Sequence, residues 1–552
     1  MKRRFAITLQ GTNMEVDWGV TILELVEKAP ILVEGVVAAK VNNALHPLSF
    51  IIKGCCNVEL VSVDSPEGMR VYRNSLVLLM IRAAKEVLPG ARVHIEHSLS
   101  NGLFGEIEAD QALIEQDVEH IEQRMREIVT KDELIRKHKM GKDEASTIFK
   151  KQGLHDKVKL LSYSRRELIN VHSCGWYYDT IGDVMVPSTA YLDVFKLRFY
   201  LPGFILEFPK TENPTIIPEY VEQGKLANVY YETEKWSKNI GIANAASLNE
   251  AISAEKINEL IQVSEGYHEK KIAAIADQIS SERDRLRIIL IAGPSSSGKT
   301  TFAHRLSIQL RINGLRPVAI SLDDYFVNRE YTPRDEAGEY DFEAIEAIDM
   351  RLFNEQLSKL IQGETVELPT FSFIEGERQW RGHTLHVSAD QPIIIEGIHG
   401  LNDKLTSAIP KGRKFKIYVS ALTQLNVDDH SRIATTDVRL IRRMIRDNQF
   451  RSHNAIDTLL RWPSVRRGEE KHIFPFQEDA DVMFNSALGY ELSVLKKHVE
   501  PLLRGITNDQ FAYAESRRLL SLLSHFHSVE LEEDIPAISI LREFIGGSSF
   551  AK

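Results

Sequence analysis

The chain has 552 residues, of which 43% are hydrophobic and 26% charged, and its formal net charge is -10. This length predicts two to four domains, because single hydrophobic cores stop growing well below it. The composition is ordinary for a globular protein, no apolar run is long enough to span a membrane, and the acidic balance argues against a chain wrapped in nucleic acid. Three cysteines (Cys55, Cys56 and Cys174) cannot build a disulfide framework, and the basic start of the chain lacks the apolar core of a secretory signal. We therefore expect a cytoplasmic protein with reduced thiols.

The first 60 residues have the pattern of short strands around one helix. Strands are predicted over 5–9, 14–16, 36–41 and 58–63, the first two joined by a turn at Gly11. Thr21 is placed to cap a helix that runs to Lys28, with Glu24 as its capping-box partner. This order predicts a β-grasp module over residues 1–62.

The next segment, 63–230, mixes both kinds of element. Helices are predicted over 75–87 and 112–129, the second with Glu119 and Gln123 on its solvated face, and a strand over 92–96. Five prolines between Pro187 and Pro218 exclude helices there. Residues 231–285 are polar with helical spacing and are interpreted as a helical connector.

From residue 286 to 552, strands and helices alternate. The pattern predicts strands over 288–292, 318–322, 393–396, 416–419 and 481–484, and helices over 300–313, 350–362, 437–447 and 488–498. Such alternation is typical of a parallel sheet covered by helices on both faces.

The first of these strands leads into a phosphate-binding pattern. Gly293 to Thr300 reads G-x-x-x-x-G-K-T, and a strand before it and a helix after it are the setting of a P-loop. Backbone N–H groups of such a loop turn inward on phosphates, and the helix adds its positive dipole end. The alternative is an ordinary glycine–serine turn. The predicted nucleotide-binding residues are Gly293, Ser295, Ser296, Ser297, Gly298, Lys299, Thr300 and Thr301, with Lys299 on the β and γ phosphates and the Thr300 hydroxyl on Mg²⁺.

Acidic residues follow two of the later strands. Asp323 and Asp324 come after the second strand, and Glu396 ends the third. The carboxyl ends of parallel strands form the ligand crevice, so Asp323 is placed to take a proton from an attacking hydroxyl and Glu396 to hold Mg²⁺. The competing interpretations are a turn or cap for the aspartates and a chance strand-end acid for Glu396. His399 is interpreted as an ordinary loop histidine.

Arginines recur at helical spacing in VRLIRRMIRDNQFR. Arg439, Arg442, Arg443 and Arg446 share one helix face, with Arg451 beyond. A solvated basic face is the simplest explanation, but after a P-loop we expect a lid that clamps the transferred phosphate.

These motifs, in this order, resemble the phosphoribulokinase/uridine kinase family over about 286–500. The resemblance rests on GPSSSGKTT, SLDDYF, YDFEAIEAID, GETVELPTFSFIEGER, IIIEGI and DVRLIRRMIRD. It implies a P-loop kinase domain that uses ATP and Mg²⁺. It also implies a general-base role for Asp323, lid roles for Arg442, Arg446 and Arg451 (the last also binding nucleotide), and substrate contacts from Asp324, Tyr325, Phe342, Glu343, Phe371, Phe373 and Arg378.

The sequence departs from the uridine kinases in its acceptor pocket. Glu343 stands where they have an aspartate for the ribose, Phe371 lacks the hydroxyl of their tyrosine, and their base-reading histidine is replaced near Gly376. Lost hydrogen-bonding groups lower discrimination between analogues, so the chemistry transfers but pyrimidine specificity does not.

The front half, about 1–225, resembles the TGS and editing-like domains of threonyl-tRNA synthetases. The resemblance rests on VNNALHPLSF, YRNSLVLLMIRAAKEVLPGARV, LIEQDVEHIEQRMREIVTKDE and VPSTAYLDVFKL. Those synthetases carry an H-x-x-x-H pair where this chain has Asn74 and Leu78, and their later Cys–His half survives only as His172 and Cys174. Zinc needs three or four N or S ligands, so we expect neither zinc nor editing chemistry to remain, and a buried turn at His172 and Cys174.

The sequence thus predicts a β-grasp module, an α+β editing-like domain and a P-loop α/β kinase domain, acting as an ATP- and Mg²⁺-dependent nucleoside kinase. Asp323, Lys299, Arg442 and Arg446 are the expected catalytic residues, and Thr300 and Glu396 the expected metal ligands. The alternatives are a kinase of another small hydroxyl compound, such as a purine nucleoside or sugar phosphate, and an RNA-linked nucleotide-binding regulator. We expect a small-molecule substrate, no membrane partner and a homo-oligomer.

Overall fold

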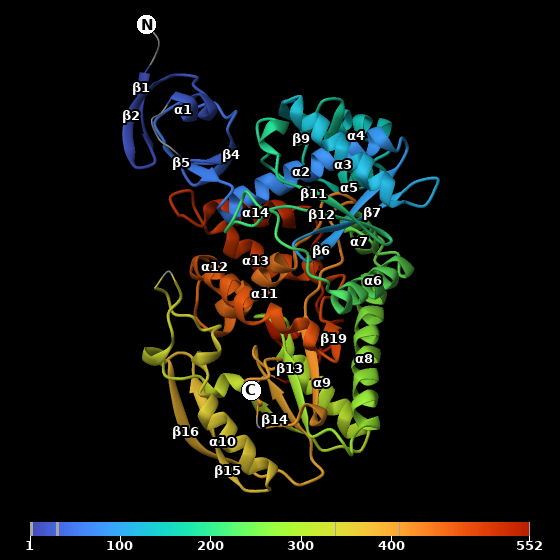
Figure 1. The fold of residues 1–552 in the computed structure, drawn as a ribbon, viewed down its shortest axis with the longest axis vertical. Coiled ribbons are helices and arrows are strands. Elements are labelled where there is room, and N and C mark those ends of the chain that lie inside the picture. Colours follow the sequence, from blue (N-terminus) through green and yellow to red (C-terminus); the bar gives the residue numbers. More distant parts are fainter. Residues whose placement is uncertain (1–3, 29–32, 337, 408, 551–552) are drawn as a thin grey trace.

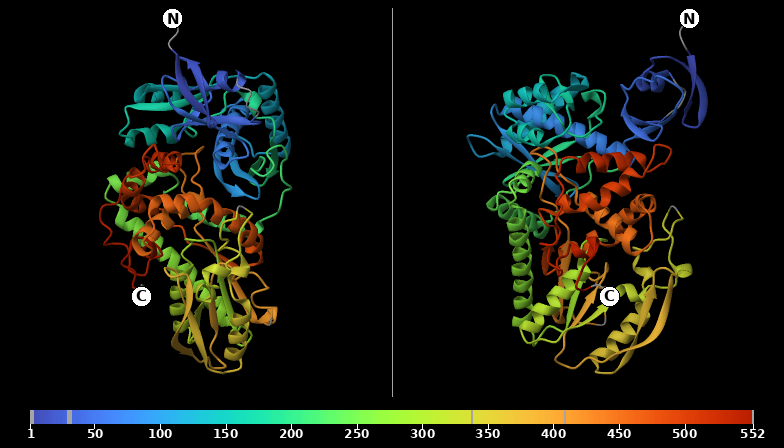
Figure 2. Two further views of the ribbon diagram at one scale, coloured as in Figure 1. Left: turned by 90° about the vertical axis from the view of Figure 1, so that its left-hand side faces the viewer. Right: turned by 180° about the vertical axis from the view of Figure 1, so that it is seen from behind.

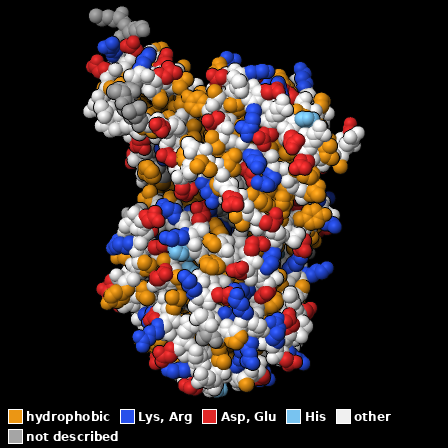
Figure 3. Space-filling model, viewed as in Figure 1, with side chains coloured by type: hydrophobic (Ala, Val, Ile, Leu, Met, Phe, Trp, Pro, Cys, Tyr) orange, Lys and Arg blue, Asp and Glu red, His pale blue; other side chains and the backbone are white. Residues whose placement is uncertain are grey.

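The computed structural model describes residues 4–28, 33–336, 338–407 and 409–550. The molecule is elongated, with the N-terminal half at one end and a parallel sheet at the other (Figure 1). Helices from the C-terminal part of the chain lie between the two (Figures 1 and 2). No helix among the described residues is long and apolar enough to cross a membrane. Acidic and basic side chains are interspersed over the face shown in Figure 3.

The first residues form a five-stranded mixed sheet with one helix. The strands are β1 (Arg4–Leu9), β2 (Thr12–Asp17), β3 (Val36–Val41), β4 (Ala44–Pro47) and β5 (Asn57–Ser62), in the order β2-β1-β5-β3-β4. The predicted capping box of α1 (Ile22–Lys28) is confirmed, because Thr21 N–H donates to the Glu24 carboxylate and Glu24 N–H donates to Thr21 Oγ1. This is the β-grasp arrangement that the sequence predicts. The N-terminal residues 1–3, part of the segment searched for a signal, lie outside the described residues.

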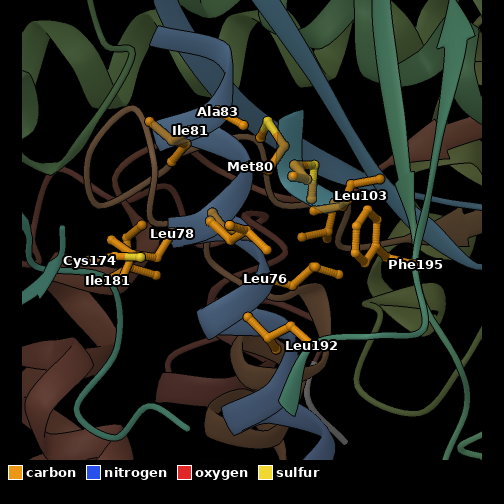
Figure 4. Packing of buried hydrophobic residues seen from close by; sticks show 14 of the residues in the cluster. Leu76, Leu78, Met80, Ile81, Ala83, Leu103, Cys174, Ile181, Leu192 and Phe195 are labelled. Atoms are coloured by element: carbon orange, nitrogen blue, oxygen red, sulfur yellow. The ribbon is translucent and has the colours of Figure 1, made fainter. Parts of the chain in front are cut away.

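The second unit is built around α2 (Pro66–Val87), which is longer than predicted because Ser65 caps it and Pro66 occupies its first turn. A four-stranded sheet, in the order β11-β12-β7-β6, packs beside it together with α3 (Glu115–Thr130). Figure 4 shows the apolar side chains of α2, including Leu76 and Met80, meeting Leu103 and Phe195. The strands of this sheet are β6 (Arg92–Leu99), β7 (Gly102–Glu108), β11 (Lys196–Tyr200) and β12 (Gly203–Glu207).

A smaller antiparallel sheet completes this unit. Its strands are β8 (Ile135–Gly141), β9 (Leu168–Cys174) and β10 (Tyr177–Asp179), with α4 (Lys142–Lys151) and α5 (His155–Tyr163) between the first two. The predicted connector is helical, and consists of α6 (Gly224–Asn239), α7 (Ala245–Ser253) and the long α8 (Ile257–Ser281). Figure 1 shows α8 running along one side of the molecule to the parallel sheet.

The predicted parallel sheet is confirmed, with all five strands parallel in the order β14-β17-β13-β18-β19. Its strands are β13 (Ile288–Ala292), β14 (Val318–Ser321), β17 (Ile393–Glu396), β18 (Lys414–Ser420) and β19 (Val482–Asn485). The predicted helices are α9 (Lys299–Ile312), α10 (Met350–Ile361), α11 (Thr435–Phe450) and α13 (Glu491–Arg504). β13 is buried throughout, which explains its continuous apolar run.

Several elements were not predicted. The strands β15 (Val366–Ser372) and β16 (Glu377–Leu385) form a separate hairpin, and α12 (Ala455–His472) continues through Pro463. The chain then returns through α14 (Tyr513–Leu523) to α15 (Arg542–Ile545). The C-terminal helices also contact the front half, where Asn43 Nδ2 donates to Asn508 O at 2.9 Å.

Candidate active site

The P-loop adopts a backbone conformation suited to binding an anion. Ser296 has φ 58° and Gly298 has φ 84°, so two residues of the loop are left-handed. A Cβ on Gly293 would lie 1.9 Å from Val419 O, and one on Gly298 would lie 2.4 Å from Ile540 Cγ2. Glycine is therefore required at both ends of the loop by close approach of neighbouring atoms. Loops of this conformation turn successive N–H groups toward one point, as a phosphate requires.

The parallel sheet brings the predicted acidic residues to the same edge as the loop. Glu396 pairs in register with Ile291 on one side and with Ser321 on the other. Asp323 follows Ser321 in a short 3-10 turn, where its N–H donates to Ser321 Oγ at 3.3 Å. The ends of three neighbouring strands therefore carry the P-loop with Lys299, the turn with Asp323, and Glu396. The sequence predicted this arrangement, because it places the loop or an acidic residue at the end of each of these strands.

Lys299 and Asp323 both lie close enough to Glu396 to affect the charge of its carboxylate. Burial raises the pKa of Glu396 to about 7; the Lys299 ammonium opposes this rise, Asp323 and Glu543 add to it, and the Thr300 hydroxyl bonds the carboxylate. Thr300 and Glu396 thus form a hydroxyl–carboxylate pair of oxygen ligands beside the loop. Oxygen donors of this kind suit Mg²⁺, so these residues fit the predicted metal role.

A buried ion pair covers the start of the loop. Glu469, on α12, accepts a hydrogen bond from Ser295 N–H at 3.2 Å and forms an ion pair with Arg439 of α11. Arg439 also donates to Ser295 O at 2.9 Å. One loop amide is therefore already bound to a carboxylate oxygen, an acceptor similar to those that a phosphate would offer.

A second carboxylate reaches the loop from the C-terminal end of the chain. Glu543 of α15 accepts from Thr301 N–H at 3.2 Å and from Thr301 Oγ1 at 2.7 Å. Ile540, three residues earlier, packs on Gly298. The C-terminal segment consequently lies on the first turn of α9, where a helix offers unpaired N–H donors to phosphates.

The predicted arginine face of α11 does turn toward the P-loop, but its members differ in what they bind. Arg442 is fully buried and donates to the Glu491 carboxylate at 2.7 Å and to Ser486 O at 2.9 Å. This corrects its predicted role as a lid residue. A guanidinium held in this way stabilises the loop from the interior and cannot move over a substrate.

The remaining arginines lie closer to the open side of the site. Arg443 donates to Ser295 Oγ at 3.0 Å, and Arg446 is held by Asp447 at 2.9 Å. The pKa of Arg451 falls to about 10, mainly because Arg446 is near, while Asp447 and Asp323 oppose the fall. Arg451 therefore lies close enough to the predicted general base, Asp323, to be affected by its charge, and Arg446 lies close to Arg451.

Aromatic side chains of the hairpin cluster with Phe326 next to the turn that carries Asp323. Phe371 and Phe373 are 5.3 Å apart between ring centroids, and Phe326 lies 5.6 Å from Phe371. Arg451 stacks over Phe373 at 5.0 Å. Asp324 accepts from Phe371 N–H at 3.3 Å, which ties the hairpin to the turn that carries Asp323. The three rings provide stacking surface and no hydroxyl for a planar ligand.

Three predicted substrate contacts are placed elsewhere. Tyr325 is buried in the core, where its hydroxyl donates to Gln356 Oε1 at 2.7 Å, so its side chain faces away from the site. Arg378 forms an ion pair with Asp349 at 3.0 Å and donates to Phe326 O at 3.1 Å, so it fixes the hairpin. Phe342 is exposed and lies near Tyr340 rather than near the three rings.

Glu343 packs on α12, where a Cβ on Gly468 would lie 2.4 Å from Glu343 Cβ. Burial and the neighbouring Glu469 raise the pKa of Glu343 to about 7, against the opposing effect of Arg443, Lys299 and Arg439. Its Oε2 is buried without a hydrogen-bond partner. A carboxyl in this state takes up a proton near neutral pH and then donates a hydrogen bond.

Glu343→Gln is expected to remove a pH-dependent loss of stability. Because the folded-state pKa lies above the ordinary value of 4.5, the folded protein binds the extra proton between these two values, and stability falls as the pH rises from 4.5 to about 7. The variant should match the wild type at about pH 4 and exceed it at about pH 8.5 by about 3 kcal/mol. Thermal unfolding midpoints across this range measure the difference. The exposed Glu346→Gln serves as control, and equal pH profiles for wild type and Glu343→Gln would contradict the assignment.

The positions that correspond to a synthetase zinc site are occupied by structural side chains. Leu78 is buried in the core of the second unit, and His172 is buried as well. Cys174 Sγ lies 3.2 Å from Arg82 Nη1, and burial raises the pKa of the thiol. Asn74 packs against Gly182, where a Cβ would lie 2.5 Å from Asn74 Nδ2.

The sequence did not predict that Glu469 and Glu543 contact the P-loop. Glu469 lies in a polar helix with no motif, and Glu543 lies more than 240 residues beyond the loop in sequence. No local spacing signals either contact, because both arise from packing of distant helices.

Comparison with known proteins agrees with the two resemblances. Residues 288–491 match the model of the phosphoribulokinase/uridine kinase family. A solved structure described as a "Possible Uridine Kinase" from Bacillus stearothermophilus is 20% identical, with a TM-score of 0.28, and the match covers 39% of this chain and 98% of that one.

The N-terminal half matches threonine–tRNA ligases. The ligase of Pelobacter propionicus is 31% identical over 188 residues, and that of Rubrobacter xylanophilus is 30% identical over 189 residues. Each match covers 34% of this chain, but only 30% and 29% of the respective ligase. The chain therefore spans less than a third of the length of these relatives.

Proposed function

We propose that this chain contains an ATP- and Mg²⁺-dependent kinase of a small hydroxyl compound. The proposal concerns the part of the chain whose residues 288–491 match the phosphoribulokinase/uridine kinase family. The finer proposal is transfer of the γ-phosphoryl group to the 5′-hydroxyl of a nucleoside. The observation that carries it is the meeting of Lys299, Asp323 and Glu396 at the ends of three neighbouring parallel strands.

Each group has a distinct task in this proposal. The loop amides and Lys299 hold the triphosphate, and Asp323 accepts the proton of the attacking hydroxyl. Mg²⁺, when bound by Thr300 and Glu396, neutralises charge on the phosphates. Arg451, which lies near Asp323 and over Phe373, and its neighbour Arg446 stabilise charge on the transferred group and exclude water, which would otherwise be the acceptor.

The aromatic rings support a ring-shaped acceptor. Phe326, Phe371 and Phe373 cluster next to the turn that carries Asp323, and aromatic faces stack on bases without selecting one of them. This favours a nucleoside over a sugar phosphate and leaves purines and pyrimidines as equal candidates.

A panel of nucleosides and sugar phosphates, incubated with ATP and Mg²⁺, tests the proposal by product formation. Lys299→Met is the control, since it removes the grip on the phosphates and should abolish every product. Phosphorylation of a sugar phosphate alone would replace the finer proposal, and product from Lys299→Met at the wild-type rate would refute the site.

A second candidate, an RNA-linked nucleotide-binding regulator, rests on the match of the N-terminal half to threonine–tRNA ligases. Filter binding of bulk tRNA at physiological salt separates it from the first. Tight, salt-sensitive binding together with an inactive panel would favour the regulator. We place either activity in the cytoplasm, as the reduced cysteines suggest.

A further inference from the structure

A cavity of about 1330 Å³ lies between the front half and the C-terminal helices. One wall is α2, with Arg70, Arg73 and Asn74, and the opposite wall includes α14 and the segment that leads into α11. Figure 1 shows α14 directly beneath α2. The P-loop, Asp323 and Glu396 are not among the lining residues, so this space is separate from the kinase site. Its volume is more than enough for a small ligand.

Two of the arginines in this cavity are balanced by acids. Arg518 forms ion pairs with Asp437 at 2.7 Å and with Glu515 at 2.6 Å. Arg70 binds the same Glu515 at 3.1 Å. These two carboxylates are therefore already neutralised by two guanidinium groups.

Two further arginines in the cavity lack acidic partners. Among the described residues, Arg73 makes no ion pair or hydrogen bond, and Arg432 donates only to the Ser98 hydroxyl while its buried Nε has no acceptor. Burial, together with the neighbouring Arg432 and Arg70, lowers the pKa of Arg73 to about 9, and the nearby Asp437 only partly opposes this fall. A cluster of like charges that is left uncompensated in a protein interior is unfavourable unless an anion joins it.

The outer part of the cavity is basic as well. Arg165, Lys496 and Arg504 line it, and the pKa of Lys496 is lowered by burial, with Arg165 and Arg504 contributing. Glu500 opposes this effect and pairs with Arg504. The excess of positive charge thus continues from Arg73 toward the mouth of the cavity.

We propose that this cavity is a binding site for a small anion that carries phosphate groups, bound by Arg73 and Arg432. Guanidinium groups present forked donors that match phosphate oxygens, and two of them a short distance apart can share one ligand. Since the ligand would touch both α2 and the C-terminal helices, it would also join the two halves of the chain.

The test uses pyrophosphate as the probe, in Mg²⁺-free buffer, with the full-length Lys299→Met protein so that the P-loop no longer responds. Pyrophosphate is expected to raise the thermal unfolding midpoint by about 2–4 °C near a hundredfold excess over its Kd, compared with chloride at matched ionic strength. Arg73→Gln, and independently Arg432→Gln, should abolish this rise. Arg381→Gln, an exposed arginine of β16, is the control and should keep it.

The same variants give a second readout without ligand. Arg73→Gln removes an uncompensated charge and should raise the midpoint in chloride buffer, whereas Arg518→Gln leaves Asp437 without its ion pair and Glu515 with Arg70 alone, and should lower it. The proposal is overturned if the Lys299→Met protein does not respond to pyrophosphate. It is equally overturned if Arg73→Gln and Arg432→Gln respond as fully as the control.

Discussion

Asp323→Asn is expected to slow phosphoryl transfer to the best acceptor about a thousandfold, the contribution typical of a positioned general base. The amide keeps the shape of the 3-10 turn, whose hydrogen bond to Ser321 uses the backbone N–H rather than the side chain. It cannot accept the proton of the attacking hydroxyl. Steady-state kinetics with the acceptor identified in the panel measure the loss, and calorimetry with ATP should show nearly unchanged affinity.

Asp324→Asn is the matched comparison for this experiment. Its carboxylate accepts from Phe371 N–H, so the variant loosens the aromatic hairpin. The expected effect is a higher KM for the acceptor with a smaller change in kcat. If Asp323→Asn turns over its acceptor at a rate close to that of the wild type, Asp323 is not the base.

Glu543→Gln is expected to tighten ATP binding about tenfold, because charge-assisted hydrogen bonds to a carboxylate contribute on the order of 1.5–3 kcal/mol. Glu543 accepts both donors of Thr301, N–H and Oγ1, in the first turn of α9. A phosphate group needs the same donors, so the two anions compete. The neutral amide would be displaced more easily, and it would no longer repel the phosphates.

Glu533→Gln controls for the change in net charge, since Glu533 is exposed in the same C-terminal segment. Its ATP affinity should equal that of the wild type. Titration calorimetry of the three proteins gives the comparison directly. Equal affinities for Glu543→Gln and Glu533→Gln would show that the carboxylate on Thr301 does not hinder the nucleotide.

The kinase half shows which features local sequence patterns could predict. The apolar run before Gly293 and the acid after 393–395 predicted two buried strands, and the structure places them side by side in parallel. Hydrophobic runs and turn residues are read within a few positions of the chain, so strands, helix starts and the P-loop followed from them. The order of strands then brought Asp323 and Glu396 to one edge.

Helix α11 shows what local sequence patterns could not predict. Spacing placed Arg439, Arg442 and Arg446 on one face, and α11 does turn that face to the loop. The spacing did not distinguish Arg442, which binds Glu491 in the interior, from Arg446, which stays near the surface. The two residues have the same chemistry, and only the helices packed around α11 distinguish them.

The sequence by itself determined the class of fold, the anion-binding loop and the identity of the acids beside it, because each depends on residues that are close in the chain. Only the tertiary structure decided which carboxylates occupy the loop amides and which arginines are neutralised. It also revealed the basic cavity that Arg73 and Arg432 share. These features depend on contacts between residues hundreds of positions apart, where burial and the nearest opposite charge set the state of every ionisable group.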